Sequence, residues 1–209
     1  MAMQVVIVAN GELAAPISSY DYDFLIAVDN GLHYCLQQKC IPDLLIGDLD
    51  SVSTIDMVQA QQLNIPTQQY PREKDQTDLE LALLHAIECL AAKKIIVLAT
   101  MGGRDDMCLA NALILTQSQF RDYDIELVGL KQSIHLITEN KPFIKQLALQ
   151  RIVSLLPITL TVEGVTTQGL EYPLSHATLY IGSTRSISNV VTEELVSISI
   201  CSGLLLVLL

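Results

Sequence analysis

Residues 42–52 read PDLLIGDLDSV, an apolar run that ends in two aspartates. Leu44–Ile46 shows no alternation of apolar and polar residues, which is typical of a parallel strand covered on both faces. Asp48 and Asp50 follow at the carboxyl end of this predicted strand. Because open α/β sheets bind ligands outside the carboxyl ends of their strands, the stretch indicates both a fold class and the edge where a site would lie.

Runs of the same kind occur on both sides of this stretch and alternate with helical patterns. They are Val5–Val8, Phe24–Val28, Ile95–Ala99 and Ile125–Val128. The clearest helix is predicted from Asp78 to Leu90, where apolar residues recur at three- and four-residue spacing after a Thr77–Glu80 capping box. A second helix is predicted to begin near Asp105. The alternation predicts an N-terminal α/β domain with a doubly wound parallel sheet.

The pattern changes after Leu130, where short strand-like runs are separated by glycine and proline. The runs are Ile134–Thr138, Arg151–Leu156, Thr159–Val162, Thr178–Ile181, Val190–Val191, Leu195–Ile200 and the final SGLLLVLL. They predict a small C-terminal antiparallel β-sandwich domain. The segment ENKP breaks the pattern between these regions, so we place the domains at residues 1–138 and 139–209.

Composition narrows the class of protein. A net charge of -11 argues against a nucleic-acid surface, and bound Mg²⁺ would let so acidic a protein hold an anionic substrate. The N-terminal MAMQVVIVAN lacks the basic segment of a signal peptide, and the final apolar run is far too short to cross a bilayer. The five cysteines show no CxxC spacing and are expected to be reduced. We therefore expect a cytoplasmic protein that binds neither nucleic acid nor membrane.

Three carboxylates could share one metal ion. Asp48 and Asp50 stand close enough in the chain to reach one hard cation, although an acidic surface turn gives the same pattern. Asp78 stands at the predicted first helical position, where an acidic residue is also an ordinary partner of the helix dipole. With Asp78 as a third ligand the pattern fits a Mg²⁺ site, and both interpretations stay open at this point.

A Gly-Gly turn provides a different kind of binding element. The strand that ends near Ala99 leads into Gly102, Gly103, Arg104 and a helix start. Glycine permits close backbone approach, a helix N-terminus offers free N–H groups, and arginine offers a bidentate fork for phosphate. The pattern favours anion binding, and the lack of a Walker A sequence excludes a P-loop.

The segment AVDNG follows the second predicted strand and lies at the same predicted sheet edge. Its Asp29, Asn30 and Gly31 could contribute to a site there. They could equally form a plain helix cap.

In their order along the chain, these motifs resemble those of the bacterial thiamine pyrophosphokinase family. The order is NG at Gly11, AVDNG, PDLLIGDLDS, KDQTDLELAL, GGRDD with LAN, VSLLPI, VTTQGLEYPL, SISN and a final SG-L-L-L strand. The resemblance covers essentially the whole chain, and the combination is specific although each motif alone is not.

The resemblance implies a fold and an activity. Family members have an α/β nucleotide domain followed by a β-sandwich and act as homodimers. They bind ATP and Mg²⁺ and transfer a diphosphoryl group to the thiamine hydroxyl, which gives thiamine diphosphate and AMP. We therefore expect this chain to be a thiamine diphosphokinase whose partners are ATP, thiamine and a second copy of itself.

The resemblance also implies roles for particular residues. The family's catalytic, metal-binding aspartates correspond to Asp48, Asp50 and Asp78. Its thiamine-contacting Ser-Asn element corresponds to Ser188 and Asn189, in a site at the dimer interface. The expected ATP- and phosphate-binding residues are Asp29, Asn30, Gly31, Ser51, Lys74, Asp75, Thr77, Gly102, Gly103, Arg104, Asp106 and Asn111.

One position departs from the family pattern. The family usually has His or Gln after the GGR-x-D aspartate, whereas this chain has Met107. Methionine donates no hydrogen bond and is a weak acceptor. If the family side chain touches substrate, the activity or the acceptor preference of this chain is altered.

Other functions fit parts of the sequence. A haloacid-dehalogenase-like phosphatase would use Asp48 as nucleophile and Asp50 as acid, but its DxD strand comes first in the chain and here it comes third. A pterin diphosphokinase would run a similar reaction on another acceptor. A non-catalytic thiamine or nucleotide sensor is suggested only by Met107. AMP release from ATP with and without thiamine would separate these alternatives.

Overall fold

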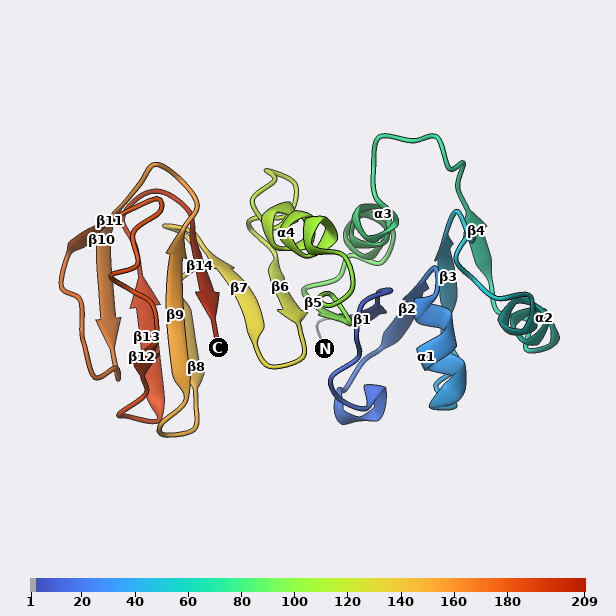
Figure 1. Ribbon diagram of the computed structural model, residues 1–209, viewed down its shortest axis with the longest axis horizontal. Helices are drawn as coiled ribbons and strands as arrows, with labels where there is room; N and C mark the ends of the chain where they lie inside the picture. The colour runs from blue at the N-terminus through green and yellow to red at the C-terminus, as the bar shows by residue number, and fades with distance from the viewer. Residues whose placement is uncertain (1–2) are drawn as a thin grey trace. The chain divides into compact units, whose positions relative to one another are not determined.

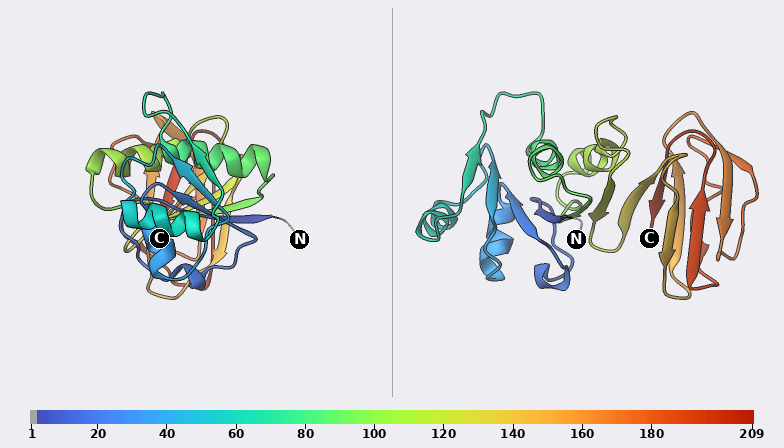
Figure 2. Two further views of the ribbon diagram at one scale, coloured as in Figure 1. Left: turned by 90° about the vertical axis from the view of Figure 1, so that its right-hand side faces the viewer. Right: turned by 180° about the vertical axis from the view of Figure 1, so that it is seen from behind.

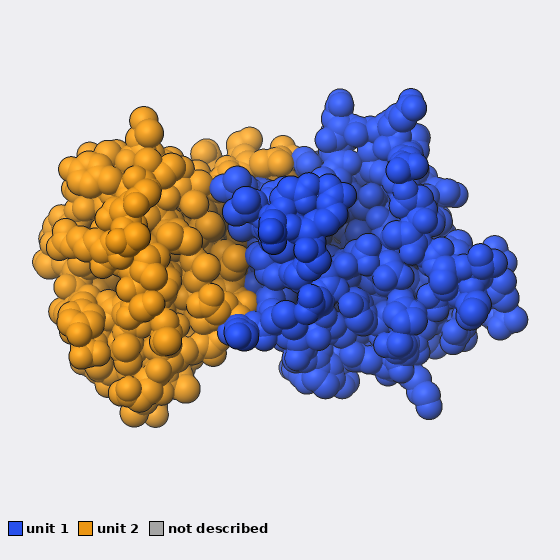
Figure 3. All heavy atoms as spheres, in the orientation of Figure 1, with its two compact units in different colours: residues 1–114, 123–131 blue, residues 115–122, 132–209 orange. Residues whose placement is uncertain are grey.

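A computed structural model, which describes residues 3–209, divides the chain into two compact units (Figure 1, Figure 3). The first unit consists of the residues up to Ile114 together with Tyr123–Lys131. The second unit consists of Leu115–Asp122 and Gln132–Leu209. The division falls before β7 (Ser133–Ile137), whereas the boundary expected from the sequence falls after it. The difference arises because β7 pairs with β14 (Leu205–Leu208), a long-range contact that no local pattern reveals.

The first unit contains a parallel sheet with the strand order β6-β5-β1-β2-β3-β4. Its strands are β1 (Gln4–Val8), β2 (Phe24–Val28), β3 (Leu44–Gly47), β4 (Thr67–Gln69), β5 (Lys94–Leu98) and β6 (Asp124–Val128). Consecutive residues of the inner strands are buried, as in Val5–Val8 and Leu25–Val28, because both faces of the sheet are covered.

Helices cover both faces of this sheet (Figure 1, Figure 2). They are α1 (Gly31–Gln37), α2 (Thr54–Gln62), α3 (Asp78–Leu84) and α4 (Asp105–Ile114), with a short 3₁₀ turn η1 (Ile17–Ser19) and a π-helical segment η2 (His85–Cys89). The helix expected from Asp78 to Leu90 is present as α3 continued by η2, where the Leu90 amide donates to the His85 carbonyl. No helix within residues 3–209 is long and apolar enough to span a bilayer.

The second unit is an antiparallel β-sandwich. A sheet of order β12-β9-β14-β7 and a sheet of order β11-β10-β13-β8 share one buried apolar cluster, which includes Val153, Val165, Val196 and Leu205. The remaining strands are β8 (Phe143–Gln146), β9 (Ile152–Pro157), β10 (Thr161–Gln168), β11 (Ala177–Tyr180), β12 (Asn189–Val190) and β13 (Leu195–Ser199). The predicted fold class, α/β followed by a small β domain, is confirmed.

Strand β10 runs further than the sequence predicted. The expected strand ended at Val162, before Gly164, but β10 continues to Gln168. Gly164 has a φ of 69°, and the pairing of β10 with β11 shifts register between Val162 and Val165. The glycine therefore forms a bulge within one strand instead of ending it.

Candidate functional site

A cavity of about 600 Å³ opens at the carboxyl end of the parallel sheet. Its wall includes the residues that directly follow four strands: Ala9 after β1, Asp29 after β2, Asp48 after β3 and Ala99 after β5. This is the edge of the sheet at which the sequence placed a binding site.

The backbone at this edge turns sharply at residues other than glycine. Asp29, Leu49 and Ala99 have φ values of 47°, 66° and 55°, in the left-handed region that costs such residues about 1–2 kcal/mol each. In this conformation Leu49 directs its N–H at Asp29 Oδ1, 3.1 Å away. Asp29 Oδ1 also occupies the space that a Cβ on Gly47 would need, so only glycine fits between these two turns.

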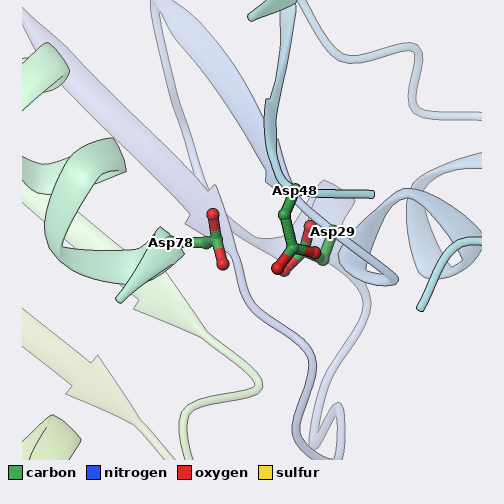
Figure 4. Close-up of side chains that lie close together, drawn as sticks. All are labelled: Asp29, Asp48 and Asp78. Carbon is green, nitrogen blue, oxygen red and sulfur yellow. The ribbon is translucent and has the colours of Figure 1, made fainter. Parts of the chain in front are cut away.

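Three aspartates meet where these turns approach α3. One carboxylate oxygen from each of Asp29, Asp48 and Asp78 lies within 4.8 Å of the other two (Figure 4). Asp78 is the first residue of α3, and its neighbour Thr77 caps the helix by accepting a hydrogen bond from the Glu80 amide at 3.2 Å. Carboxylate oxygens from three separate elements at this spacing form a set that a hard divalent cation could use.

Burial and neighbouring groups shift the pKa values of Asp29 and Asp48 in opposite directions. Burial, with smaller contributions from the charges of Asp78 and Asp48, raises the pKa of Asp29 to about 7. The Asp50 amide, which donates to Asp48 Oδ1 at 3.0 Å, lowers the pKa of Asp48, and Lys74 adds to this effect. Asp78 Oδ1 is buried and accepts no hydrogen bond.

Lys74 lies in the loop before α3 and is the basic residue that pairs with these carboxylates. Its Nζ lies 3.1 Å from Asp78 Oδ1 and 3.8 Å from Asp48 Oδ2. The Asp78 contact is an ion pair without hydrogen-bond geometry, because that oxygen accepts no hydrogen bond. One ammonium group therefore pairs with two of the three carboxyl groups of the cluster.

Asp50 lies outside the aspartate cluster, although the sequence grouped it with Asp48 and Asp78. Its side chain is 49% exposed and lies 3.4 Å from Arg72 Nε. Asp50 contributes its backbone N–H to the Asp48 carboxylate instead of a carboxylate of its own. The structure thus brings together Asp48, Asp78 and Asp29, the last of which the sequence had grouped with the phosphate-binding residues.

The Gly-Gly turn also lies on the cavity wall. Gly102 and Gly103 have φ values of 94° and 77°, and nothing lies within 4 Å of where a Gly103 Cβ would stand. Arg104 lines the cavity and forms a bidentate, exposed ion pair with Asp106, with donor–acceptor distances of 3.1 and 2.6 Å. Asn111 is buried and donates to the Thr100 carbonyl at 2.8 Å, which ties α4 to the end of β5.

The predicted ATP- and phosphate-binding residues divide into two groups. Those on the cavity wall are Asp29, Lys74, Thr77, Gly102, Gly103, Arg104 and Asn111. The second group, whose members the structure describes but does not place on the cavity wall, consists of Asn30, Gly31, Ser51, Asp75 and Asp106. Gly31 has a packing reason to be glycine, because a Cβ there would collide with the Val8 carbonyl.

The expected thiamine-binding pair belongs to the second unit. Asn189 is buried, and its side chain accepts from the Tyr172 amide at 3.0 Å and donates to the Tyr172 carbonyl at 2.8 Å. Ser188 is exposed, has a φ of 60°, and donates its amide to Ser154 Oγ at 3.0 Å. Asn189 therefore holds the backbone at Tyr172 in place, and Ser188 is the exposed member of the pair.

Several cavity residues escaped the sequence-based prediction. Arg72 and Gln76 flank Lys74 within PREKDQTD, and Asn10 follows β1. The path of a loop decides which of its residues line the cavity. The distance of such a residue from a motif along the sequence does not reveal that path. Met107 lies on the wall as well, so the position that departs from the family pattern faces the cavity.

Comparisons with known proteins match both units. Residues 19–127 match the family model for the thiamin pyrophosphokinase catalytic domain, and residues 134–205 match that for the thiamin pyrophosphokinase vitamin B1 binding domain. A thiamine pyrophosphokinase of Bacillus subtilis (strain 168) is 29% identical over 206 residues, covering 97% of this chain and 96% of that protein.

Solved structures agree with these matches. A crystal structure of thiamine pyrophosphokinase from Bacillus subtilis has a TM-score of 0.88 at 27% identity, covering 98% of this chain and 97% of that one. A crystal structure of thiamin pyrophosphokinase from Geobacillus thermodenitrificans has a TM-score of 0.87 at 29% identity, covering 99% of this chain and 96% of that one.

Proposed function

We propose that this chain takes the diphosphoryl group from ATP, releases AMP and works with Mg²⁺ at the aspartate cluster. The premise is that the chain belongs to the thiamin pyrophosphokinase family and is a thiamine diphosphokinase. The family membership confirms the resemblance inferred from the order of the motifs. The observation that carries the proposal is the meeting of Asp29, Asp48 and Asp78 on the wall of a single cavity.

The aspartate cluster fits Mg²⁺ by the chemistry of its donors. Mg²⁺ prefers carboxylate oxygens, and the buried Asp78 Oδ1 accepts no hydrogen bond and has only the ion pair with Lys74. We assign Asp29, Asp48 and Asp78 as the side chains that would hold the ion, with Asp50 supporting Asp48 through its amide. When bound, Mg²⁺ would neutralise charge on the phosphates of ATP.

The rest of the cavity suits a nucleoside triphosphate. A volume of about 600 Å³ lies within the usual range for small-ligand pockets. The N–H groups at the start of α4 and the Arg104 guanidinium, which now pair in part with Asp106, would supply donors for phosphate oxygens. The transfer itself forms a bond from the thiamine hydroxyl oxygen to the β-phosphorus and breaks the bond to the oxygen that leaves with AMP. Such reactions depend on positioning and electrostatics more than on covalent chemistry by the protein.

We further propose that the second unit contributes to thiamine binding in a homodimer. Ser188 would contact thiamine in a site completed by the aspartate loops of a second copy, and Asn189 would hold Ser188 in place through Tyr172. We expect the enzyme to work in the cytoplasm.

The decisive experiment measures AMP release from ATP with thiamine, with a pterin alcohol and with neither, in the presence and absence of Mg²⁺. We expect AMP and thiamine diphosphate in equal amounts, only when thiamine and Mg²⁺ are both present. AMP release with the pterin alcohol and not with thiamine would identify the pterin as the acceptor and contradict the assignment of thiamine. Inorganic phosphate as product, with phosphate covalently attached to Asp48, would contradict the proposal in favour of phosphatase chemistry.

A further inference from the structure

Lys74 holds a position inside the aspartate cluster that its surroundings enforce. Only 11% of its side chain is exposed, and its ammonium contacts Asp78, Asp48 and the Pro71 carbonyl, the last at 3.1 Å. Asp48 and Asp78 are themselves 13% and 16% exposed. A lysine side chain normally keeps its charged end in water, so this burial is favourable only because the carboxylates surround the ammonium group.

The other basic side chains on the cavity wall are directed elsewhere. Arg72 lies against Asp50, and Arg104 pairs with Asp106. Both of these arginines are largely exposed, at 81% and 74%. Lys74 therefore provides the compensating charge for the half-buried carboxylates of Asp48 and Asp78.

A divalent cation would compete with the ammonium for the same oxygens. Mg²⁺ binds carboxylate oxygens at about 2.1 Å, so an ion on Asp78 Oδ1 would lie within about 5 Å of Lys74 Nζ as the side chain now stands. Two cations that share Asp48 and Asp78 at such a separation repel one another strongly in a site partly withdrawn from water. The ammonium and the metal ion therefore compete for the carboxylates of Asp48 and Asp78.

We propose that Lys74 is the resident counter-ion of the metal-free site and that a divalent cation displaces its ammonium from Asp48 and Asp78. The proposal rests on the Mg²⁺ site of the proposed function and adds a regulatory role for one residue. Because Lys74 lines the cavity, its ammonium, once displaced, remains beside the space that the triphosphate would occupy. Metal binding thereby converts an internal ion pair into a free cation for an anionic substrate, and the two ligands bind with positive coupling.

Calorimetric titration of the 209-residue protein with Mn²⁺ alone tests the displacement, because Mn²⁺ shares the preference of Mg²⁺ for oxygen ligands. Lys74→Met keeps an unbranched side chain of nearly the same length and removes its charge. Arg72→Met is the matched control, because it removes a positive charge that lines the same cavity but lies outside the aspartate cluster. We expect Lys74→Met to bind Mn²⁺ at least about tenfold more tightly than the wild type, and Arg72→Met to change the affinity by no more than about threefold. Equal effects of the two substitutions would overturn the proposal, since net charge would then explain both.

A labelling experiment on the wild type covers the case in which Lys74→Met does not fold without metal. Limiting acetic anhydride should modify Lys74 slowly in the metal-free protein and several times faster with saturating Mn²⁺, as measured by mass spectrometry of its peptide. Lys39, which is exposed beyond the end of α1 and is not part of the cavity wall, should react at the same rate in both states. A Lys74 that stays protected when Mn²⁺ is bound would refute the displacement.

These outcomes separate the inference from the proposed function. Thiamine diphosphate formation with unchanged Mn²⁺ affinity in Lys74→Met would remove the role of Lys74 and leave the reaction intact. Tighter Mn²⁺ binding by Lys74→Met, combined with a wild type that forms no thiamine diphosphate, would keep the role of Lys74 and contradict the proposed function. A wild type and variants that bind no divalent cation would contradict both.

Discussion

At the scale of single residues, Asp48 and Asp78 would each offer a metal ion a charged oxygen ligand. Asp→Asn keeps the shape of the side chain and one carbonyl oxygen but removes this charge, and hard cations bind neutral ligands more weakly. Asp48→Asn and Asp78→Asn should therefore raise the Mg²⁺ concentration for half-maximal activity by about tenfold or more. Excess Mg²⁺ should recover part of the activity, most readily in Asp78→Asn. Initial rates of AMP release against Mg²⁺ concentration measure this.

Asp50→Asn is the control for that series. Asp50 is half-exposed and faces Arg72, and its amide, which supports Asp48, survives the substitution. We expect a much smaller change in the Mg²⁺ requirement. If Asp50→Asn and Asp78→Asn shift it equally, the metal ligands differ from the set that the structure brings together.

Met107 allows a second test at this scale. It lies on the cavity wall at the position where the family usually has His or Gln. If the side chain contacts substrate, Met107→His should lower the KM or raise kcat, because imidazole restores a hydrogen-bonding group. Steady-state kinetics and a melting curve are measured together. Unchanged kinetics with a loss of about 1 kcal/mol of stability would mean that Met107 only packs beneath the loop.

The sequence predicted two of the three clustered carboxylates as ligands and missed the reason for the third. Asp48 follows a buried strand and Asp78 follows a capping threonine, and both signals are local. Asp29 joins them because Leu49 adopts a left-handed backbone and donates its amide to Asp29. Leucine has no preference for that conformation, so only the folded chain reveals it.

At the scale of secondary-structure elements, glycine in β10 is the feature that a local pattern misread. Gly164 has a left-handed φ, and a Cβ there would collide with Cys201, whose amide donates to Glu163 within the same sheet. The strands of the first unit were predicted well because both faces are buried and the apolar runs are continuous. Polar or short strands such as β4 and β8 were missed, since their pairing depends on distant partners.

Gly164→Ala should therefore destabilise the second unit by about 2–4 kcal/mol, which combines left-handed strain with the collision. Gly182→Ala is the matched control: its φ is 79°, but nothing lies within 4 Å of its added Cβ. That change should cost only about 1 kcal/mol of strain. Denaturant unfolding of both variants provides the comparison. Equal losses would show that the contact with Cys201 relaxes freely.

At the scale of the whole molecule, the proposed thiamine site requires a second copy. The second unit carries Ser188 exposed at its surface, and large apolar side chains such as Leu160, Tyr180 and Ile181 are more than half exposed. Leu160 and Ile181 lie side by side, because the Ile181 amide donates to the Leu160 carbonyl at 3.1 Å, and contiguous exposed apolar side chains often mark interaction sites. We expect sedimentation velocity at micromolar concentration to give a dimer. A monomer that is fully active under the same conditions would contradict a site shared between copies.

The position of strand β14 in its sheet has a consequence for folding during synthesis on the ribosome. The strand pairs with β7 on one side and β9 on the other, so the sheet that holds the core of the second unit lacks its middle strand until residues 205–208 have been synthesised. The parallel sheet of the first unit has all of its strands once Val128 has emerged. A nascent chain stalled before Leu205 should therefore carry a protease-resistant first unit and a second unit that proteases still degrade.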